Sequence, residues 1–296
     1  MHNLITSIWK LSYLPTLLLT SLIACNSPTS QQADHETSID EAIVPAASEL
    51  KMYVFTVGDI LVKDISQFSP GIDEGLSKQF TNSAYLIRHD KGDLIWDTGL
   101  PDGLSQNPDG NDAGNFVMKM PKTMSSQLEE VGLDPSDVDF LGLSHLHGDH
   151  IGNANLFTSA TLLLQEEEYA GLFEGETVNP NLDSLKNNKV VKLKGDHDVF
   201  GDGTVVIKRA VGHTAGHQVL FVNLPETGPI VLSGDLYHFS KNRDQRGVPV
   251  FNFDKELSLQ AMDSIEKFIA QENATLWIQH DYEQNQAIPH APEYIK

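Results

Sequence analysis

Three histidines and an aspartate lie within the six residues 145–150, which read HLHGDH. Buried imidazole and carboxylate groups are costly unless they are paired or bound to a metal ion, so this segment predicts a chemical site rather than a packing element. His145 and His147 can reach one ion, while Asp149 and His150 reach a second ion nearby. The spacing therefore favours a centre that holds two divalent metal ions.

Each ion of such a centre needs further ligands from later in the chain. Three candidates follow strand-like segments or a glycine turn, and they are His213, Asp235 and His280. Two divalent ions that share a bridging water generate hydroxide at neutral pH and polarise a bound carbonyl oxygen. The pattern therefore predicts a hydrolase, in which Asp149 also steers a proton toward the leaving group.

The elements that must position these residues form an alternating pattern of strands and helices. A short apolar strand over 138–143 ends at the histidine segment, and a final strand over 275–278 leads into His280. Helical spacing of apolar residues predicts helices over 123–131 and 255–271. Further strands are expected over 52–57, 83–88, 94–96, 160–164, 190–193, 204–207, 218–222 and 229–232. The alternation predicts two α/β halves.

The composition excludes several classes of function. With 41 acidic and 20 basic residues the formal net charge is -21, and a chain this acidic repels phosphate backbones. Nucleic acid is therefore not expected as a partner. A single cysteine excludes both an intramolecular disulfide and a metal site built on several thiolates. No particular oligomeric state is favoured.

The N-terminal segment is similar to a bacterial lipoprotein signal, because a charged start and a short apolar run precede Cys25. The similarity implies a signal peptide over 1–24, lipid on Cys25, and an exported protein anchored in the cell envelope, periplasmic or outer membrane. The membrane is then contacted only through this anchor. The alternative is a plain secretory signal cleaved near Ala24. The polar stretch 25–50 is expected to be a flexible tether, and 51–296 the hydrolase domain.

From about Lys51 onward the chain resembles the metallo-β-lactamase superfamily, and most of all its N-acyl homoserine lactone lactonase branch. The matching motifs are WDTG at 96–99, SHLHGDHIG at 144–152, GHTAGH at 212–217, SGD at 233–235, and His280. The resemblance implies an α+β fold, a four-layer αββα sandwich in a single domain, with the site at one edge.

The resemblance also implies a ligand set and two supporting residues. The implied ligands are His145, His147 and His213 for one zinc ion, Asp149, His150 and His280 for the other, and Asp235 as the bridge. Asp97 would orient a ligand histidine, the alternative being a turn-forming aspartate in Asp-Thr-Gly. For His217, support of the loop or of a ligand is expected rather than metal binding. Two zinc ions are the expected cofactors, although imidazole and carboxylate ligands also suit Mn, Fe or Co.

The implied reaction is the opening of a lactone ring, as in N-acyl homoserine lactones, by a metal-bridging hydroxide. Alternatives on the same site are an organophosphate, aryl-ester or β-lactam hydrolase, and a metal-binding lipoprotein without catalysis is a further one. One departure from the lactonases concerns the third residue after the bridging aspartate. A tyrosine is usual there, whereas this chain has His238, with Tyr237 just before it. Both are candidate catalytic residues beside Asp149.

Each residue also has a structural alternative without a catalytic role. Tyr237 would then belong to the core, and His238 would lie on a surface loop. The substrate pocket should be apolar with few polar groups. Its candidate wall residues are Phe116, Met118, Met120, Leu146, Phe239, Phe251 and Phe253, and the stretch 68–71 is expected near the mouth.

Overall fold

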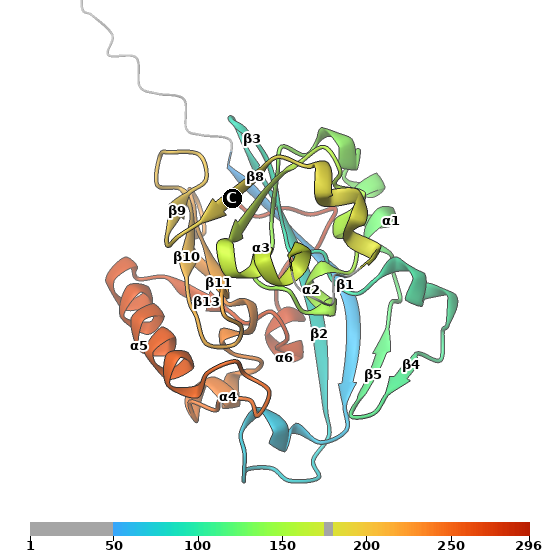
Figure 1. Cartoon of the computed structure of the whole chain (residues 1–296), viewed down its shortest axis with the longest axis vertical. Coiled ribbons are helices and arrows are strands. Elements are labelled where there is room, and N and C mark those ends of the chain that lie inside the picture. The colour runs from blue at the N-terminus through green and yellow to red at the C-terminus, as the bar shows by residue number, and fades with distance from the viewer. Residues whose placement is uncertain (1–49, 175–179) are drawn as a thin grey trace, which may run out of the picture. The chain divides into compact units, whose positions relative to one another are not determined.

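The computed structural model of the protein describes residues 50–174 and 180–296 (Figure 1). The predicted signal peptide, Cys25 and all but the last residue of the predicted tether lie outside these ranges. Within them, the helices are too short or too polar to cross a lipid bilayer.

Two β-sheets form the centre of the described fold. The first has eight strands in the order β4-β5-β1-β2-β3-β6-β7-β8, and β3, β6, β7 and β8 run parallel. Its strands are β1 Lys51–Val62, β2 Lys78–His89, β3 Gly92–Trp96, β4 Asn111–Ala113, β5 Phe116–Lys119, β6 Phe140–Gly142, β7 Thr161–Gln165 and β8 Val190–Leu193.

The second sheet has five strands in the order β13-β12-β11-β10-β9. The pair of β12 and β13 runs parallel, and the other pairs are antiparallel. The strands are β9 His197–Asp198, β10 Val205–Arg209, β11 Gln218–Leu224, β12 Gly228–Leu232 and β13 Thr275–Trp277.

Helices cover the outer faces of the sheets. The α-helices are α1 Met124–Glu130, α2 Gly148–Ile151, α3 Glu166–Phe173, α4 Ser240–Asp244, α5 Lys255–Glu272 and α6 Tyr282–Asn285. Short 3-10 helices are η1 Ile65–Phe68, η2 Asp102–Gln106, η3 Pro135–Asp137, η4 Ala154–Leu156, η5 Pro180–Asn187 and η6 Gly234–Leu236. Asp254 caps the start of α5 by accepting a hydrogen bond from the Leu257 backbone N–H at 2.8 Å.

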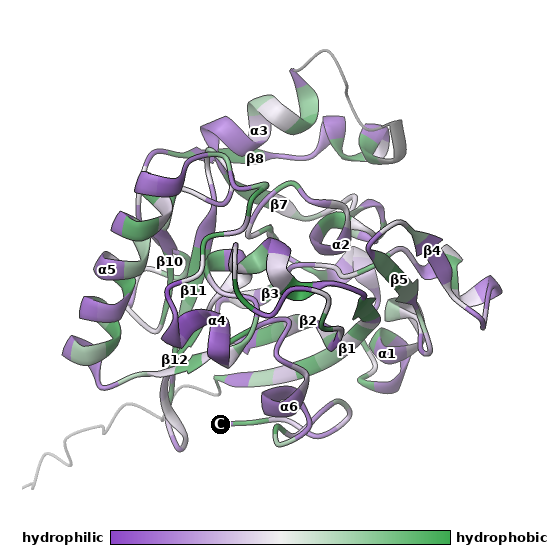
Figure 2. Cartoon of the chain, turned by 90° about the horizontal axis from the view of Figure 1, so that it is seen from below, coloured by the Kyte–Doolittle hydropathy of each residue, from purple (hydrophilic) through white to green (hydrophobic). Residues whose placement is uncertain are grey.

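The buried residues separate into layers because strand side chains alternate between faces. Met52 and Val54 of β1 join Leu220 in a cluster between the two sheets, while Phe55 and Val57 point the other way into a cluster that includes α1. A third cluster joins the outer face of the second sheet to α5, which lies beside these strands in Figure 2. The predicted four-layer αββα sandwich is thus confirmed.

The predicted strands and the two predicted helices are confirmed, with small shifts at their ends. The strand predicted over 52–57 continues to Val62 through a register shift beside Gly58, whose φ is 149°. The sequence pattern missed α3 and the hairpin of β4 and β5. The residues of β4 are all exposed, so no alternating apolar pattern marks this strand.

Candidate metal centre

The site lies where strands of both sheets end. Asp97 follows β3 and His145 follows β6, while Asp235 follows β12 and His280 follows β13. Each of these two strand pairs is parallel, so its carboxyl ends meet at one edge. Side chains distant in sequence are thereby brought to one place.

Four residues, which we name the first donor group, could hold one metal ion: His145, His147, His213 and Asp235. The His147 Nδ1 atom lies 3.0 Å from His145 Nε2 and 2.9 Å from His213 Nε2, and the two Nε2 atoms are 3.1 Å apart. All four donor atoms lie within 4.8 Å of one another.

A second donor group consists of Asp149, His150 and His280, whose donor atoms also lie within 4.8 Å of one another. The Nε2 atoms of the two histidines are 3.3 Å apart, and Asp149 Oδ2 lies 3.6 Å from His280 Nε2. Both imidazoles are buried, whereas the Asp149 side chain is 25% exposed at the pocket. This group is therefore closed except on the Asp149 side.

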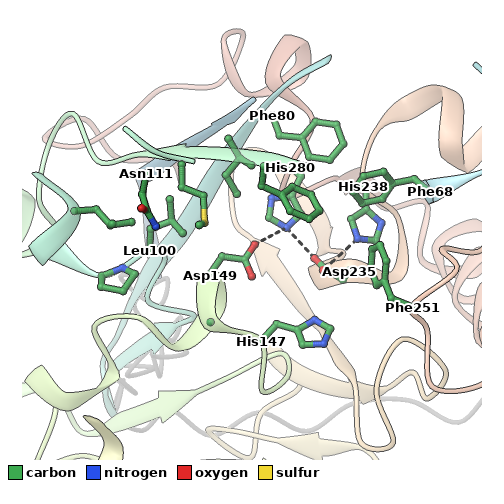
Figure 3. Close-up of a pocket in the computed structure, with 16 residues that line it drawn as sticks. Phe68, Phe80, Leu100, Asn111, His147, Asp149, Asp235, His238, Phe251 and His280 are labelled. Atoms are coloured by element: carbon green, nitrogen blue, oxygen red, sulfur yellow. Dashed lines mark ion pairs between the residues drawn. The ribbon is translucent and has the colours of Figure 1, made fainter. Parts of the chain in front are cut away.

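Asp235 stands between the two groups, as Figure 3 shows for its contacts with His280 and His238. Its Oδ1 atom lies 3.1 Å from His150 Nε2 and 3.0 Å from His280 Nε2. Its Oδ2 atom lies 3.1 Å from His213 Nε2. One carboxylate oxygen thus faces each group, which is the arrangement that a bridging ligand requires.

The donor atoms fit two divalent cations. Ring nitrogens that face one another at about 3 Å repel through their lone pairs unless a cation or proton lies between them. Burial, followed by the neighbouring His213, lowers the pKa of His147 to about 4, and burial holds the pKa of His145 well below its usual value. His145 and His147 are therefore favoured as neutral imidazoles, the form that binds metal.

Charge favours a cation in the second donor group as well. Burial opposes a charged His150, but the Asp235, Asp149 and Asp97 carboxylates together raise its pKa well above the usual value. The pKa of Asp235 is held well below its usual range, against the effect of its burial, by His150, His238 and His280. Nitrogen and carboxylate ligands in this combination suit zinc.

The second nitrogen of each buried ligand histidine has its own partner. Asp97 Oδ2 lies 2.9 Å from His150 Nδ1, while Asp97 Oδ1 accepts a hydrogen bond from the Ser144 backbone N–H at 2.6 Å. The predicted contact of Asp97 with a candidate ligand histidine is confirmed. His280 Nδ1 lies 2.9 Å from the Thr81 carbonyl oxygen, which fixes that ring similarly.

His217 uses both ring nitrogens for support. Its Nδ1 lies 2.9 Å from the Ala210 carbonyl oxygen, and its Nε2 accepts a hydrogen bond from the Asp235 backbone N–H at 2.9 Å. No lone pair is left for a metal ion. The prediction that His217 supports the loop rather than binding metal is confirmed.

A cavity of about 570 Å³ opens above the donor groups (Figure 3). Its walls are apolar and include Phe68, Phe80 and Leu100, with His147, Asp149, Asp235, His238 and His280 among its lining residues. Among the predicted wall residues, Phe116, Met118 and Phe251 line this cavity. Phe68, from the stretch 68–71 that was expected near the mouth, lines it as well.

The other predicted wall residues lie elsewhere. Met120 packs in the cluster under α1, and Phe239 is buried behind Phe68 and Phe80. Leu146 packs against that same α1 cluster, and Phe253 is 64% exposed. Position in the sequence did not separate these residues from the true walls because all of them are apolar residues in loops or at strand ends.

His238 reaches the site and Tyr237 does not. His238 is 3% exposed, its Nε2 lies 3.2 Å from Asp235 Oδ2, and its ring packs on Phe68 with centroids 4.6 Å apart. Tyr237 has an extended backbone (φ −140°, ψ 150°), so its side chain points to the opposite side. Its hydroxyl donates to Glu266 Oε1 at 3.0 Å. This corrects the catalytic role expected of Tyr237, and the alternative of a core residue holds.

Several supporting residues escaped the sequence interpretation. Ser144 and Gln279 directly precede ligand histidines, and Gln279 Nε2 donates to Asp97 Oδ2 at 3.0 Å, so adjacency could have suggested them. Glu168 accepts hydrogen bonds from Thr214 Oγ1 at 2.5 Å and from the Gly216 backbone N–H at 2.7 Å. Nothing in the triple glutamate 166–168 distinguishes this buried carboxylate.

Comparisons with known proteins agree with this geometry. The family model described as the metallo-beta-lactamase superfamily matches residues 78–279. An N-acyl homoserine lactonase of Bacillus thuringiensis is 29% identical over 253 residues, which cover 83% of this chain and 98% of that protein. The lactonase AttM of Rhizobium radiobacter is 25% identical over 261 residues, covering 83% and 99%.

A solved structure of a quorum-quenching N-acyl homoserine lactone hydrolase is also similar. It has a TM-score of 0.73 and 27% sequence identity, and the match covers 83% of this chain and 98% of that one. Because the family model spans more than half of the chain, and because the donor groups meet at the sheet edge, the protein belongs to the metallo-beta-lactamase superfamily and is a metal-dependent hydrolase.

Proposed function

We propose that the protein opens lactone rings, with N-acyl homoserine lactones as the substrate class and two zinc ions as cofactors. The observation that carries this proposal is one carboxylate, Asp235, shared by two donor groups at the base of an apolar cavity. The relatives named as N-acyl homoserine lactonases support it. The organophosphate, aryl-ester and β-lactam alternatives share the same centre, and the substrate comparison below separates them from the lactones.

Divalent ions held by these two groups would supply a hydroxide nucleophile at neutral pH and polarise the lactone carbonyl. The residues of the chain would bind and orient the substrate. The walls near Phe68, Phe116 and Phe251 would bury the acyl chain, and each buried methylene contributes about 0.8 kcal/mol. This contribution favours longer acyl chains until the cavity is filled.

Two side chains at the cavity would act on the lactone group. His238 lines the cavity close to Asp235 and would donate a hydrogen bond to the substrate carbonyl, the role expected of the tyrosine it replaces. Asp149 also lines the cavity, and Asn82 Nδ2 holds its backbone carbonyl at 2.7 Å. Its carboxylate would carry a proton to the leaving alkoxide.

The test is a comparison of kcat/KM on the zinc-loaded protein. The panel contains homoserine lactones with short, medium and long acyl chains, a paraoxon-like phosphotriester, a p-nitrophenyl ester and a cephalosporin. We expect the lactones to give the highest values and Asp149→Ala to lose this activity. Absence of lactone turnover with both metal ions verified bound would reject the proposal, and a higher value for another substrate would reassign it.

We also propose that the protein is exported and held in the cell envelope by lipid on Cys25. The support is the sequence of the first 25 residues, which precede the described part of the chain. Labelling of cells with a fatty-acid probe should mark the wild type and not Cys25→Ser. An unlabelled wild type recovered outside the cells would instead indicate the plain secretory signal.

A further inference from the structure

The segment 248–254 joins the pocket wall to the first donor group. Phe251 lines the cavity, while the backbone N–H groups of Phe253 and Asp254 donate to the carbonyl oxygens of His213 and Gly212, both at 3.0 Å. The segment is therefore hydrogen-bonded directly to the loop that carries a candidate metal ligand.

Asn252 lies within this segment and faces the His213 ring. Its Oδ1 atom is 2.9 Å from His213 Nδ1, and its Nδ2 donates to Ser258 Oγ at 2.9 Å. The Ser258 hydroxyl donates its own hydrogen to the Asp254 carbonyl oxygen at 2.7 Å. Ser258 can therefore only accept from Asn252, and this fixes which end of the Asn252 amide points to His213.

The orientation of the amide determines the tautomer of His213. Because an oxygen faces His213 Nδ1, that nitrogen must carry the hydrogen. The His213 Nε2 lone pair is then left to point at the other ligands, and Nε2 lies 3.1 Å from His145 Nε2 and 2.9 Å from His147 Nδ1. This is the tautomer that a metal ion in the first donor group needs.

We name the hydrogen-bonded series Asp254 carbonyl, Ser258, Asn252 and His213 the relay. Close packing holds the relay in place. Ser258 and His213 are 2% and 3% exposed. Gly212 has a φ of 146°, and a Cβ atom there would lie 2.3 Å from the Ser258 backbone nitrogen. The His213 loop and the first turn of α5 are thus in direct contact, and only glycine fits at 212.

We infer that Asn252 is a positioning residue that holds His213 in its metal-binding tautomer through a relay from the first turn of α5. The inference deepens the proposed function and rests on it for its catalytic meaning. The relay reaches only the first donor group, because the histidines of the second group are oriented by Asp97 and Thr81. Loss of Asn252 therefore weakens the binding of one metal ion and not of the other.

The experiment measures zinc affinity of the full-length protein by chelator competition, which resolves the two ions without substrate. Asn252→Leu removes the acceptor at similar volume, and we expect one of the two ions to bind about 10–100-fold more weakly. Asn252→Asp keeps an acceptor and should retain nearly wild-type affinity. Phe253→Ala alters an exposed neighbour in the same segment and serves as the matched control.

Wild-type affinity for both ions in Asn252→Leu, or equal weakening of both, would overturn the inference. Should Asn252→Leu fail to fold, Ser258→Ala provides the second test, since it frees the amide to rotate without removing it. We expect a several-fold weakening of the same ion in Ser258→Ala, and an unchanged affinity contradicts the relay. Because the readout is metal binding, a protein inactive on lactones leaves this result interpretable.

Discussion

The two donor groups share Asp235 but are supported differently. The His213 ring of the first group is oriented by the neutral Asn252 amide, whereas His150 of the second group is oriented by the buried Asp97 carboxylate. More carboxylates surround the second group than the first. Asp149 belongs to the second group, Asp97 lies against His150, and Asp235 faces both groups. Two sites a few ångströms apart are therefore tuned by separate parts of the chain.

Asp235 and the supporting residues should therefore control different properties of the centre. A change at Asp235 should affect both ions, because one oxygen faces each group. A change at a supporting residue should affect one ion, because its hydrogen bonds reach one group. Metal stoichiometry is then as informative as activity.

The largest effect is expected for Asp235→Ala, which removes the shared carboxylate. Both ions should bind more weakly, and kcat/KM should fall by at least about 10²–10³-fold, as when one preorganised electrostatic group is lost. Zinc content after dialysis and steady-state kinetics provide the measurement. Retention of one ion at wild-type affinity would show that Asp235 serves a single group.

Asp97→Asn should weaken the second ion by about 10–100-fold and spare the first. Asparagine tolerates the left-handed backbone at this position, where φ is 58°, so the fold should persist. The asparagine keeps one oxygen acceptor and has an NH2 group in place of the other. One of the two contacts with Ser144 and His150 is therefore lost. Chelator competition tests this, and loss of the first ion instead would reverse the assignment of the two supports.

Glu168→Ala should act on the first donor group through the loop that carries His213. It leaves the Thr214 hydroxyl and the Gly216 N–H without their buried acceptor, at about 1–3 kcal/mol of unfolding free energy for each unmet group. Denaturant unfolding measures this loss, and Glu168→Gln is the matched control because its amide oxygen can still accept. An equally destabilised glutamine variant would mean that charge, not hydrogen bonding, is required.

His238→Phe should have the smallest effect on the metals, because His238 lies outside both donor groups. Both ions should remain, while lactone kcat/KM falls roughly 2–10-fold, the value of one hydrogen bond to a neutral carbonyl. Activity and zinc content are measured on the same sample. A weakened first ion would instead indicate that His238 mainly holds Asp235 Oδ2, 3.2 Å away.

The sequence predicted the strands, the histidine segment and the later candidate ligands, because these follow from local patterns and from residues placed after strands. It could not decide between His238 and Tyr237, since that choice depends on which side of an extended backbone faces the cavity. Asn252 and Glu168 were missed for another reason. Their partners, His213 and Thr214, lie 39 and 46 residues away, and no local pattern encodes such contacts.

The order of the ligands along the chain also has a consequence for biosynthesis. His280 follows β13, which reaches its place beside β12 only after α5 has crossed between them. A nascent chain halted before residue 275 therefore contains every donor of the first group and lacks one of the second. Both donor groups can therefore be complete only after translation has passed His280.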